Sequence, residues 1–203
     1  MEKTVFFRAF EEEDAELIYQ WKNDDKLTYL STGLSRRMGK DECRDWVKAR
    51  MGHHDYRVFW AICSKETGQM IGYACLTEIH YVNSSANFSG IMIGDRRYQD
   101  GMAWIETYLF VCEYVFERLN LNRLYGHAID EHKMTLAMRH AMFFTTEGVM
   151  RQAAYKNGRY YDVSIGSILR EEYFAHKEKG DYKLQSVIKR LTKAVRESNN
   201  GAQ

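Results

Sequence analysis

The chain has 203 residues and an almost even charge balance, with 29 Lys and Arg against 28 Asp and Glu. This length fits one domain with a tail, and 45% hydrophobic residues are enough to form a core. An even balance lacks the basic excess of general nucleic-acid-binding proteins. No apolar run approaches roughly 18 residues, so we predict no membrane span. The four cysteines form no CxxC pair, which indicates reduced thiols in a cytoplasmic protein without a metal site.

The first half of the chain mixes short helices with strands. Residues 4–10 form an aromatic, β-branched run that predicts a strand, and the acidic residues 11–14 favour a helix start directly after it. A second amphipathic helix is predicted over 40–51. Three further strands are predicted, over 57–63, 70–79 and 86–93, the first two as a hairpin.

The second half begins with a long apolar helix, predicted over 103–119. A short strand, another helix and a hairpin of two strands follow, over 124–129, 131–142, 143–154 and 160–169. A strand–helix–strand unit in a mostly antiparallel context is typical of an α+β fold. We therefore predict a mixed sheet of about seven strands, flanked by helices.

Residues 174–203 differ in character from the domain that we expect over 1–173. Apolar residues recur there at helical spacing, and Lys and Arg surround them, which predicts a basic amphipathic C-terminal helix. Such a helix either docks on the core or on a second copy in a homodimer, or contacts an acidic partner.

A polar loop lies between the strand that ends at Ile93 and the long helix. The first N–H groups of a helix have no internal partner, and the helix dipole adds positive charge there, so such a loop can hold a phosphate. Arg96 and Arg97 favour this interpretation, because guanidinium pairs well with phosphate. Plain connections share the same build, so the loop alone leaves both alternatives open.

Several short motifs follow the predicted elements in order. They are Arg8, Trp21-Lys22-Asn23-Asp24, Ile71-Gly72-Tyr73, Ile93-Gly94-Asp95 and Phe116 to Arg123. The most specific are Glu147 to Arg151, Asn157 to Val163 and Leu169 to Glu172. With these motifs, residues 4–173 resemble the GNAT N-acetyltransferase superfamily, in the branch of ribosomal-protein alanine and nucleotide-aminosugar acetyltransferases.

The resemblance implies a three-layer fold whose sheet splays between strands 4 and 5, with acetyl-CoA as co-substrate in that opening. The acceptor would be a primary amine of a small metabolite, for example an aminosugar nucleotide, or of a protein N-terminus. No extended acidic run points to a polyamine. The implied cofactor-binding residues are Ile91, Met92, Ile93, Arg96, Arg97, Tyr98, Gln99, Asp100, Gly101, Met102, Ala103, His132 and Arg139.

Several positions depart from the family pattern. A gapless alignment places Met102 and Trp104 where the family has glycine, and only a one-residue shift recovers Gly101. His132 replaces an asparagine, and Arg139 replaces the tyrosine that commonly acts as general acid. A guanidinium is a poor proton donor at neutral pH, so Arg139 either binds a CoA phosphate or stabilises the leaving thiolate.

Glu78 and His80 are the remaining acid–base candidates, on or just after the third strand. On strict alternation both share a face, although each also fits a plain surface residue. The altered positions leave a second hypothesis open. In it the chain is a binding or regulatory protein on a GNAT scaffold that has lost turnover.

Overall fold

The computed structural model describes residues 2–31, 36–52 and 54–200, and its centre is one seven-stranded sheet. The strands lie in the order β1-β2-β3-β4-β5-β7-β6. They are β1 (Val5–Arg8), β2 (Val58–Ser64), β3 (Met70–His80), β4 (Ser85–Ile93), β5 (Arg123–Ile129), β6 (Thr145–Lys156) and β7 (Arg159–Leu169). The predicted mixed, mostly antiparallel sheet is confirmed.

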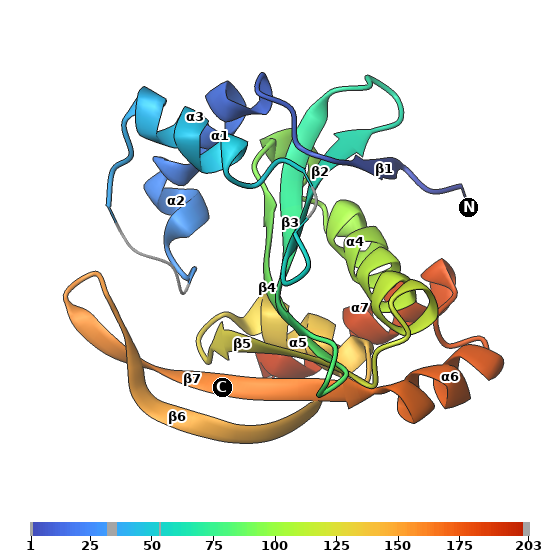
Figure 1. Cartoon of the computed structure of the whole chain (residues 1–203). Coiled ribbons are helices and arrows are strands. Elements are labelled where there is room, and N and C mark those ends of the chain that lie inside the picture. The colour runs from blue at the N-terminus through green and yellow to red at the C-terminus, as the bar shows by residue number, and fades with distance from the viewer. Residues whose placement is uncertain (1, 32–35, 53, 201–203) are drawn as a thin grey trace.

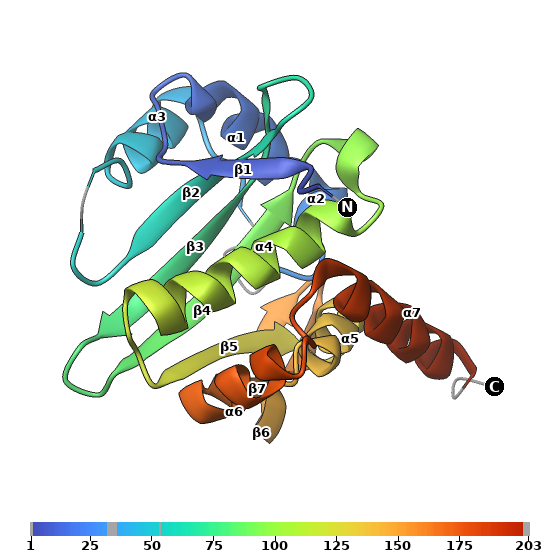
Figure 2. The same ribbon diagram turned by 90° about the vertical axis from the view of Figure 1, so that its right-hand side faces the viewer.

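Helices cover both faces of the sheet and give three layers. One layer holds α1 (Asp14–Lys22), α2 (Asp25–Thr28) and α3 (Lys40–Lys48), and the other holds α4 (Met102–Glu113), α5 (Lys133–Ala141), α6 (Arg170–Glu178) and α7 (Leu184–Asn200) (Figures 1 and 2). None of the helices within the described ranges is long and apolar enough to cross a bilayer.

The sheet divides between β4 and β5. These two strands are parallel and pair only through Ser85–Asn87 with Arg123–Tyr125, after which they diverge (Figure 1). The other neighbouring strands are antiparallel. The predicted splay is therefore confirmed, and it leaves the second half of β4 without a β5 partner in the described structure.

Two helices and one irregularity were not predicted from the sequence. Helix α2 has four residues, too few for an apolar period, and Asp24 caps it by accepting from the backbone N–H of Lys26. Helix α6 continues directly from β7, so the expected boundary at residue 173 falls inside it. The long helix is α-helical only to Glu113 and ends in a π turn, η2 (Tyr114–Arg118).

The C-terminal helix α7 packs against the main core. Val187, Leu191 and Ala194 are buried in the same hydrophobic cluster as the inner side chains of α4 and α5. The amphipathic helix predicted in the extension is confirmed by this packing. Its described part covers the end of α5, which places it behind one wall of the opening.

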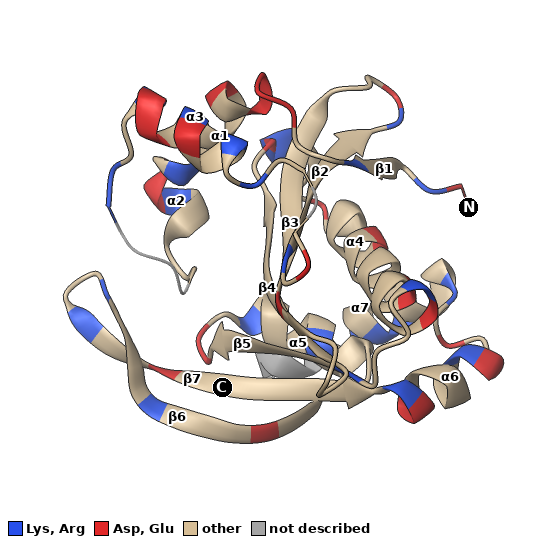
Figure 3. Cartoon of the chain, in the orientation of Figure 1, with Lys and Arg blue, Asp and Glu red and all other residues tan. Residues whose placement is uncertain are grey.

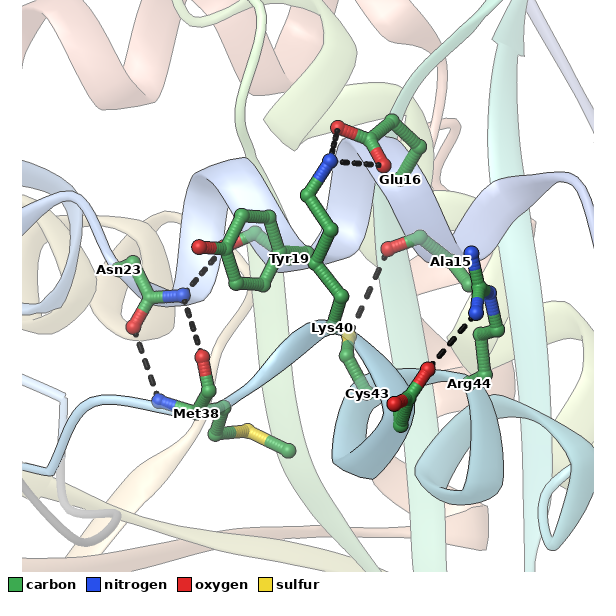
Figure 4. A network of polar contacts seen from close by, with 9 residues as sticks. Ala15, Glu16, Tyr19, Asn23, Met38, Lys40, Cys43 and Arg44 are labelled. Carbon is green, nitrogen blue, oxygen red and sulfur yellow. Dashed lines mark hydrogen bonds and ion pairs between the residues drawn. The ribbon is translucent and has the colours of Figure 1, made fainter.

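Polar side chains join α1 to α3 across the segment between them (Figure 4). The Asn23 amide accepts from the Met38 N–H at 2.9 Å and donates to the carbonyls of Tyr19 and Met38. Lys40 donates to the carboxylate of Glu16 at 3.1 Å. These contacts hold the two helices as one unit over the sheet.

A buried carboxylate joins the N-terminal strand β1 to helix α4 in the α4–α7 layer. Glu106 on α4 is 2% exposed and accepts hydrogen bonds from the N–H and hydroxyl of Thr4 and from the N–H of Val5. Because β1 has only four residues, these bonds supply an anchor that its single sheet neighbour cannot.

We predict that Glu106→Ala lowers the free energy of unfolding by about 2–4 kcal/mol, because it removes a charged acceptor and leaves buried N–H groups unpaired. Urea denaturation of the purified protein measures this. Glu113→Ala is the matched control on the same helix, since its carboxylate is 42% exposed and pairs loosely with Arg118 at 3.7 Å. An equal effect of both substitutions would contradict the anchoring role.

Candidate active site

A cavity of about 1020 Å³ passes through the opening between β4 and β5. Its lining includes the unpaired end of β4, the facing part of β5, the N-terminal parts of α4 and α5, and side chains from the α1–α3 layer. The volume reaches the upper end of ordinary ligand sites, about 300–1,000 Å³. It therefore has room for ligands that enter from both faces of the sheet.

The cavity side of β4 presents a free strand edge. Its register against β3 shifts, so that Gly90 faces Cys75 and Phe88 faces Leu76, and Ser89 between them is an extra, bulged residue. Beyond it, Ile91, Met92 and Ile93 line the cavity. An unpaired edge offers N–H and C=O groups to an extended ligand, as in strand addition.

The loop after β4 is held by its own side chains. Gln99 donates to the carbonyl of Ile93 at 3.0 Å, and Asp100 accepts from the N–H of Met102 at 3.0 Å. Gly101 begins α4 with φ 95°, which favours glycine, and its missing side chain leaves open space. Gln99 and Gly101 line the cavity, so the start of α4 faces it.

The other loop residues lie outside the cavity lining. Arg97 binds Asp95, and Arg96 reaches Asp24 at 3.2 Å. Both guanidinium groups are about two-thirds exposed, with side chains 68% and 66% accessible. Tyr98 donates to Ser64. Asp100, Met102 and Ala103 also lie outside the cavity lining, so only part of the predicted phosphate loop borders the cavity.

Trp104 and His132 line the cavity near the start of α4. The indole of Trp104 is half-buried and lies 5.9 Å from the imidazole, centroid to centroid. His132 caps α5 by accepting from the N–H of Thr135 through Nδ1. Burial lowers the pKa of His132. The cap occupies Nδ1, so Nε2 is the nitrogen that can bind a ligand.

Arg139 lies deep in the cavity, at the point where β4 and β5 separate. The residue is 8% exposed, and burial lowers the pKa of its guanidinium. Gly126 and Gly166 face each other across β5 and β7 and form a recess for it. A Cβ at Gly126 would lie 3.3 Å from Nη2, and one at Gly166 would lie 3.7 Å from Nη1. The guanidinium therefore lies directly against the two glycines.

The Gly126 position lies next to the backbone of β4 immediately after its last residue pair with β5. A Cβ at Gly126 would also lie 2.9 Å from the carbonyl oxygen of Phe88. Tyr108 on α4 lines the cavity beside Arg139, and burial raises the pKa of this phenol to about 12. The branch point therefore holds a permanent cation next to a neutral hydroxyl.

Glu78 and His80 lie outside the cavity lining. The register shifts between Thr77 and His80, and Glu78 has φ 51°, so the strict alternation that we expected along this strand is wrong. Glu78 accepts from the hydroxyl of Tyr125 at 2.5 Å, and burial together with this bond raises the pKa of Tyr125 to about 12. His80 accepts from the N–H of Asn83 in a turn. Their catalytic roles stay predictions.

His127 on β5 is a cavity residue that the sequence analysis missed. It lies next to Tyr125, with 6.0 Å between ring centroids. Residues two apart in a strand share a face, so both point away from the Gly126 side that holds Arg139. The alternation of residues 124–129 predicts the strand. Only the opening beside β5 shows that the imidazole of His127 borders a ligand site.

Thiol and metal chemistry find little support among the side chains at the site. Cys75 lines the cavity, but burial raises the pKa of its thiol, and its Sγ lies 3.3 Å from the hydroxyl of Ser89. Within the described ranges, no three His, Cys, Asp or Glu side chains gather closely enough to hold a metal ion. Near the branch of β4 and β5 the polar groups include backbone groups, the imidazole of His127 and the guanidinium of Arg139.

Comparison with known proteins agrees with this arrangement. Residues 4–142 match the family model of the GNAT acetyltransferase domain. The chain is 27% identical over 169 residues to the uncharacterized N-acetyltransferase p20 of Bacillus licheniformis, which covers 82% of this chain and 93% of that one. It is 30% identical over 110 residues to a spermidine N(1)-acetyltransferase of Vibrio cholerae, across 54% of this chain and 62% of the relative.

Solved structures share the fold. A spermidine N-acetyltransferase from Vibrio cholerae, in complex with CoA and spermine, superposes with a TM-score of 0.77 at 23% identity, covering 85% of this chain and 99% of that one. A GNAT acetyltransferase from Bacillus anthracis gives 0.71 at 16% identity, over 85% and 98%. The chain belongs to the GNAT acetyltransferase family and is an acetyl-CoA-dependent N-acetyltransferase.

Proposed function

We propose that this enzyme acetylates a primary amine of a small molecule, with acetyl-CoA entering from the α4–α5 face and the amine from the α1–α3 face. The observation that carries the proposal is the free edge of β4 inside a cavity that reaches both faces. A thioester on one side and an amine on the other would meet at the branch of β4 and β5. Such positioning is itself a large part of catalysis.

The residues on the α4–α5 face fit the co-substrate. Acetyl-CoA supplies an activated acetyl thioester. The N–H and C=O groups of 91–93 would bind its extended arm, and the N-terminus of α4 at Gly101 would receive the pyrophosphate. His132 would bind through Nε2, as the resemblance implies. The predicted cofactor roles of Arg96, Arg97, Tyr98, Asp100, Met102 and Ala103 stay predictions.

Arg139 would stabilise the negative charge that develops on the leaving sulfur. Its guanidinium is buried at the branch point and stays charged, so it supplies positive charge without donating a proton. Of the two roles left open by the sequence, this one fits better than phosphate binding. The recess at Gly126 lies at the branch of the strands, whereas the phosphate would bind at the start of α4.

His127 is the general base that we propose for the acceptor. Its imidazole borders the cavity on the opposite face from Arg139 and would take the proton that the amine loses as its nitrogen forms the C–N bond. The C–S bond breaks, and its electron pair leaves with the sulfur. Glu78 contacts this face only through Tyr125, so it would act as a positioning residue.

We further propose that residues 174–203 form an extension that supports α5. Tyr182 donates to the carbonyl of Met142, and Arg190 donates to that of Ala141, at 2.9 Å each. Phe143 has φ 63° and stacks on His176 with 3.5 Å between centroids. The extension thus donates hydrogen bonds to carbonyl groups at the C-terminal end of α5, the helix that carries Arg139. A homodimer and a protein N-terminal acceptor stay predictions.

A second function keeps one observation in its favour. Trp104 lies in the cavity wall where the family pattern has glycine, and its ring lies 5.9 Å from that of His132, centroid to centroid. A scaffold that binds a ligand without turnover would have the same cavity. Turnover with acetyl-CoA separates the two functions.

We predict that the purified protein releases CoA thiol from acetyl-CoA when a suitable primary amine from a panel is added. His127→Gln should lower kcat about 100-fold, because it removes the base, and should leave the Kd for acetyl-CoA unchanged. Thiol release measured with a chromogenic disulfide, together with calorimetry, gives both quantities. His80→Gln is the matched control, an exposed imidazole in a turn.

Two results would contradict this account. Binding of acetyl-CoA without thiol release for any amine would support the scaffold that lacks turnover. A larger loss of kcat in Glu78→Gln or His80→Gln than in His127→Gln would return the acid–base role to the residues first predicted.

We predict that Arg139→Gln lowers kcat by about 100-fold or more, with a smaller change in the KM for acetyl-CoA, because the lost charge acts mainly in the transition state. Arg139→Lys should recover part of the rate, since it keeps the charge. Lys133→Gln, an exposed cation on the same helix, is the control. A rise in KM with unchanged kcat would instead assign Arg139 to phosphate binding.

A further inference from the structure

The acceptor face of the cavity is strongly cationic. The ionisable side chains that line it from the α1–α3 layer are Lys22, Lys26, Arg36, Glu42 and Arg50. Figure 3 shows that this layer as a whole carries both signs of charge. Most of its acidic residues engage neighbouring cations at the surface, as in Glu16 with Lys40 and Asp41 with Arg44 (Figure 4). The excess of positive charge is therefore specific to the cavity.

Two of these cations lie over one indole ring. The Lys22 ammonium is 4.2 Å from the centroid of Trp46, and the Arg50 guanidinium carbon is 3.9 Å from it. Arg50 also lies 5.2 Å from Phe59. Aromatic faces stabilise cations that have lost part of their water, and they hold the side chains in place. Lys22 and Arg50 are thus fixed in the cavity wall.

Lys22 and Arg50 are not neutralised by a carboxylate of the described residues. Among the described residues, neither Lys22 nor Arg50 makes an ion pair with a carboxylate, and Glu42 binds Arg36. Arg50 donates to the carbonyl of Trp46, but its Nε is buried without a partner. Burial and the charge of Arg50 lower the pKa of Lys22. An anion at this position would offset the repulsion between Lys22 and Arg50 and would accept a hydrogen bond from Arg50 Nε.

We propose that Lys22 and Arg50 form a subsite for an anionic group of the acceptor, so that the enzyme selects amines that also carry a phosphate or carboxylate. This inference rests on the proposed function and names the substrate class. Lysine and arginine on one side of an aromatic anchor suit a phosphate best, since guanidinium pairs with it through two parallel bonds. In the proposed function the CoA phosphates would lie toward α4, on the other face of the sheet.

A polyamine does not fit this subsite. The relative from Vibrio cholerae is a spermidine acetyltransferase, and its solved structure contains spermine. A polycation would meet four cations and one already paired carboxylate on this face. Like charges in a partly buried site cost binding free energy, so the shared fold would here take an acceptor of opposite charge.

The test measures binding of an anion to the CoA-saturated protein, with inorganic pyrophosphate as the calorimetric probe. We expect binding in the wild type and a weakening of at least about tenfold in Arg50→Gln and in Lys22→Gln. Arg44→Gln is the matched control on α3, since this exposed cation pairs with Asp41 outside the cavity. Thermal unfolding of each variant checks that it is folded.

The same variants are then compared with matched amines. Glucosamine 6-phosphate should have at least about a tenfold higher kcat/KM than glucosamine, and Arg50→Gln should reduce this ratio toward one. A preference for spermidine, or pyrophosphate binding that CoA saturation abolishes, would overturn the subsite, and acetyl transfer would still stand. Pyrophosphate binding without any acetyl transfer would overturn the proposed function and leave the subsite in place.

Discussion

The short parallel pairing of β4 with β5 is the constraint on which the site depends. Three residue pairs join the strands, and the rest of β4 then runs free along the cavity. Buried N–H and C=O groups that lack a partner are costly, so a free strand edge in the interior requires water or a ligand. The bulge at Ser89 turns this edge away from β5 at the branch, which makes the opening a feature of the backbone itself.

Two unusual positions in this chain are accommodated by the residues around them. Arg139 replaces a tyrosine of the family pattern, and the facing Gly126 and Gly166 provide the recess that its guanidinium needs. Phe143 adopts a left-handed conformation that favours glycine, and His176 and Arg190 from the extension pack on its ring. The surrounding contacts offset the local strain at such positions.

The sequence predicted the sheet, its splay and most elements, because long apolar periods and family motifs carry that information. It could not predict the bulges at Ser89 and near Glu78, where one inserted residue ends the alternation on which the choice of Glu78 and His80 rested. It also missed His127, because the pattern of residues 124–129 predicts a strand but does not show that this imidazole borders the opening. The recess of Arg139 joins residues from three separate elements and has no local signal.

The two faces of the cavity differ in chemistry, and that difference explains how one opening would serve two substrates. Near α4 and α5 the cavity combines the free edge of β4 and the helix starts with one buried cation, Arg139, while near α1 and α3 the cations Lys22 and Arg50 lie over Trp46. The first set suits an extended thioester with a pyrophosphate, and the second suits a compact acceptor.

A crystal structure of the protein grown with CoA tests the central claim most directly. The account predicts ligand density along 91–93, with the pyrophosphate at the start of α4 and the sulfur beside the guanidinium of Arg139. Density on the α1–α3 face alone, or a closed opening filled by the indole of Trp104 with no ligand at β4, would contradict it.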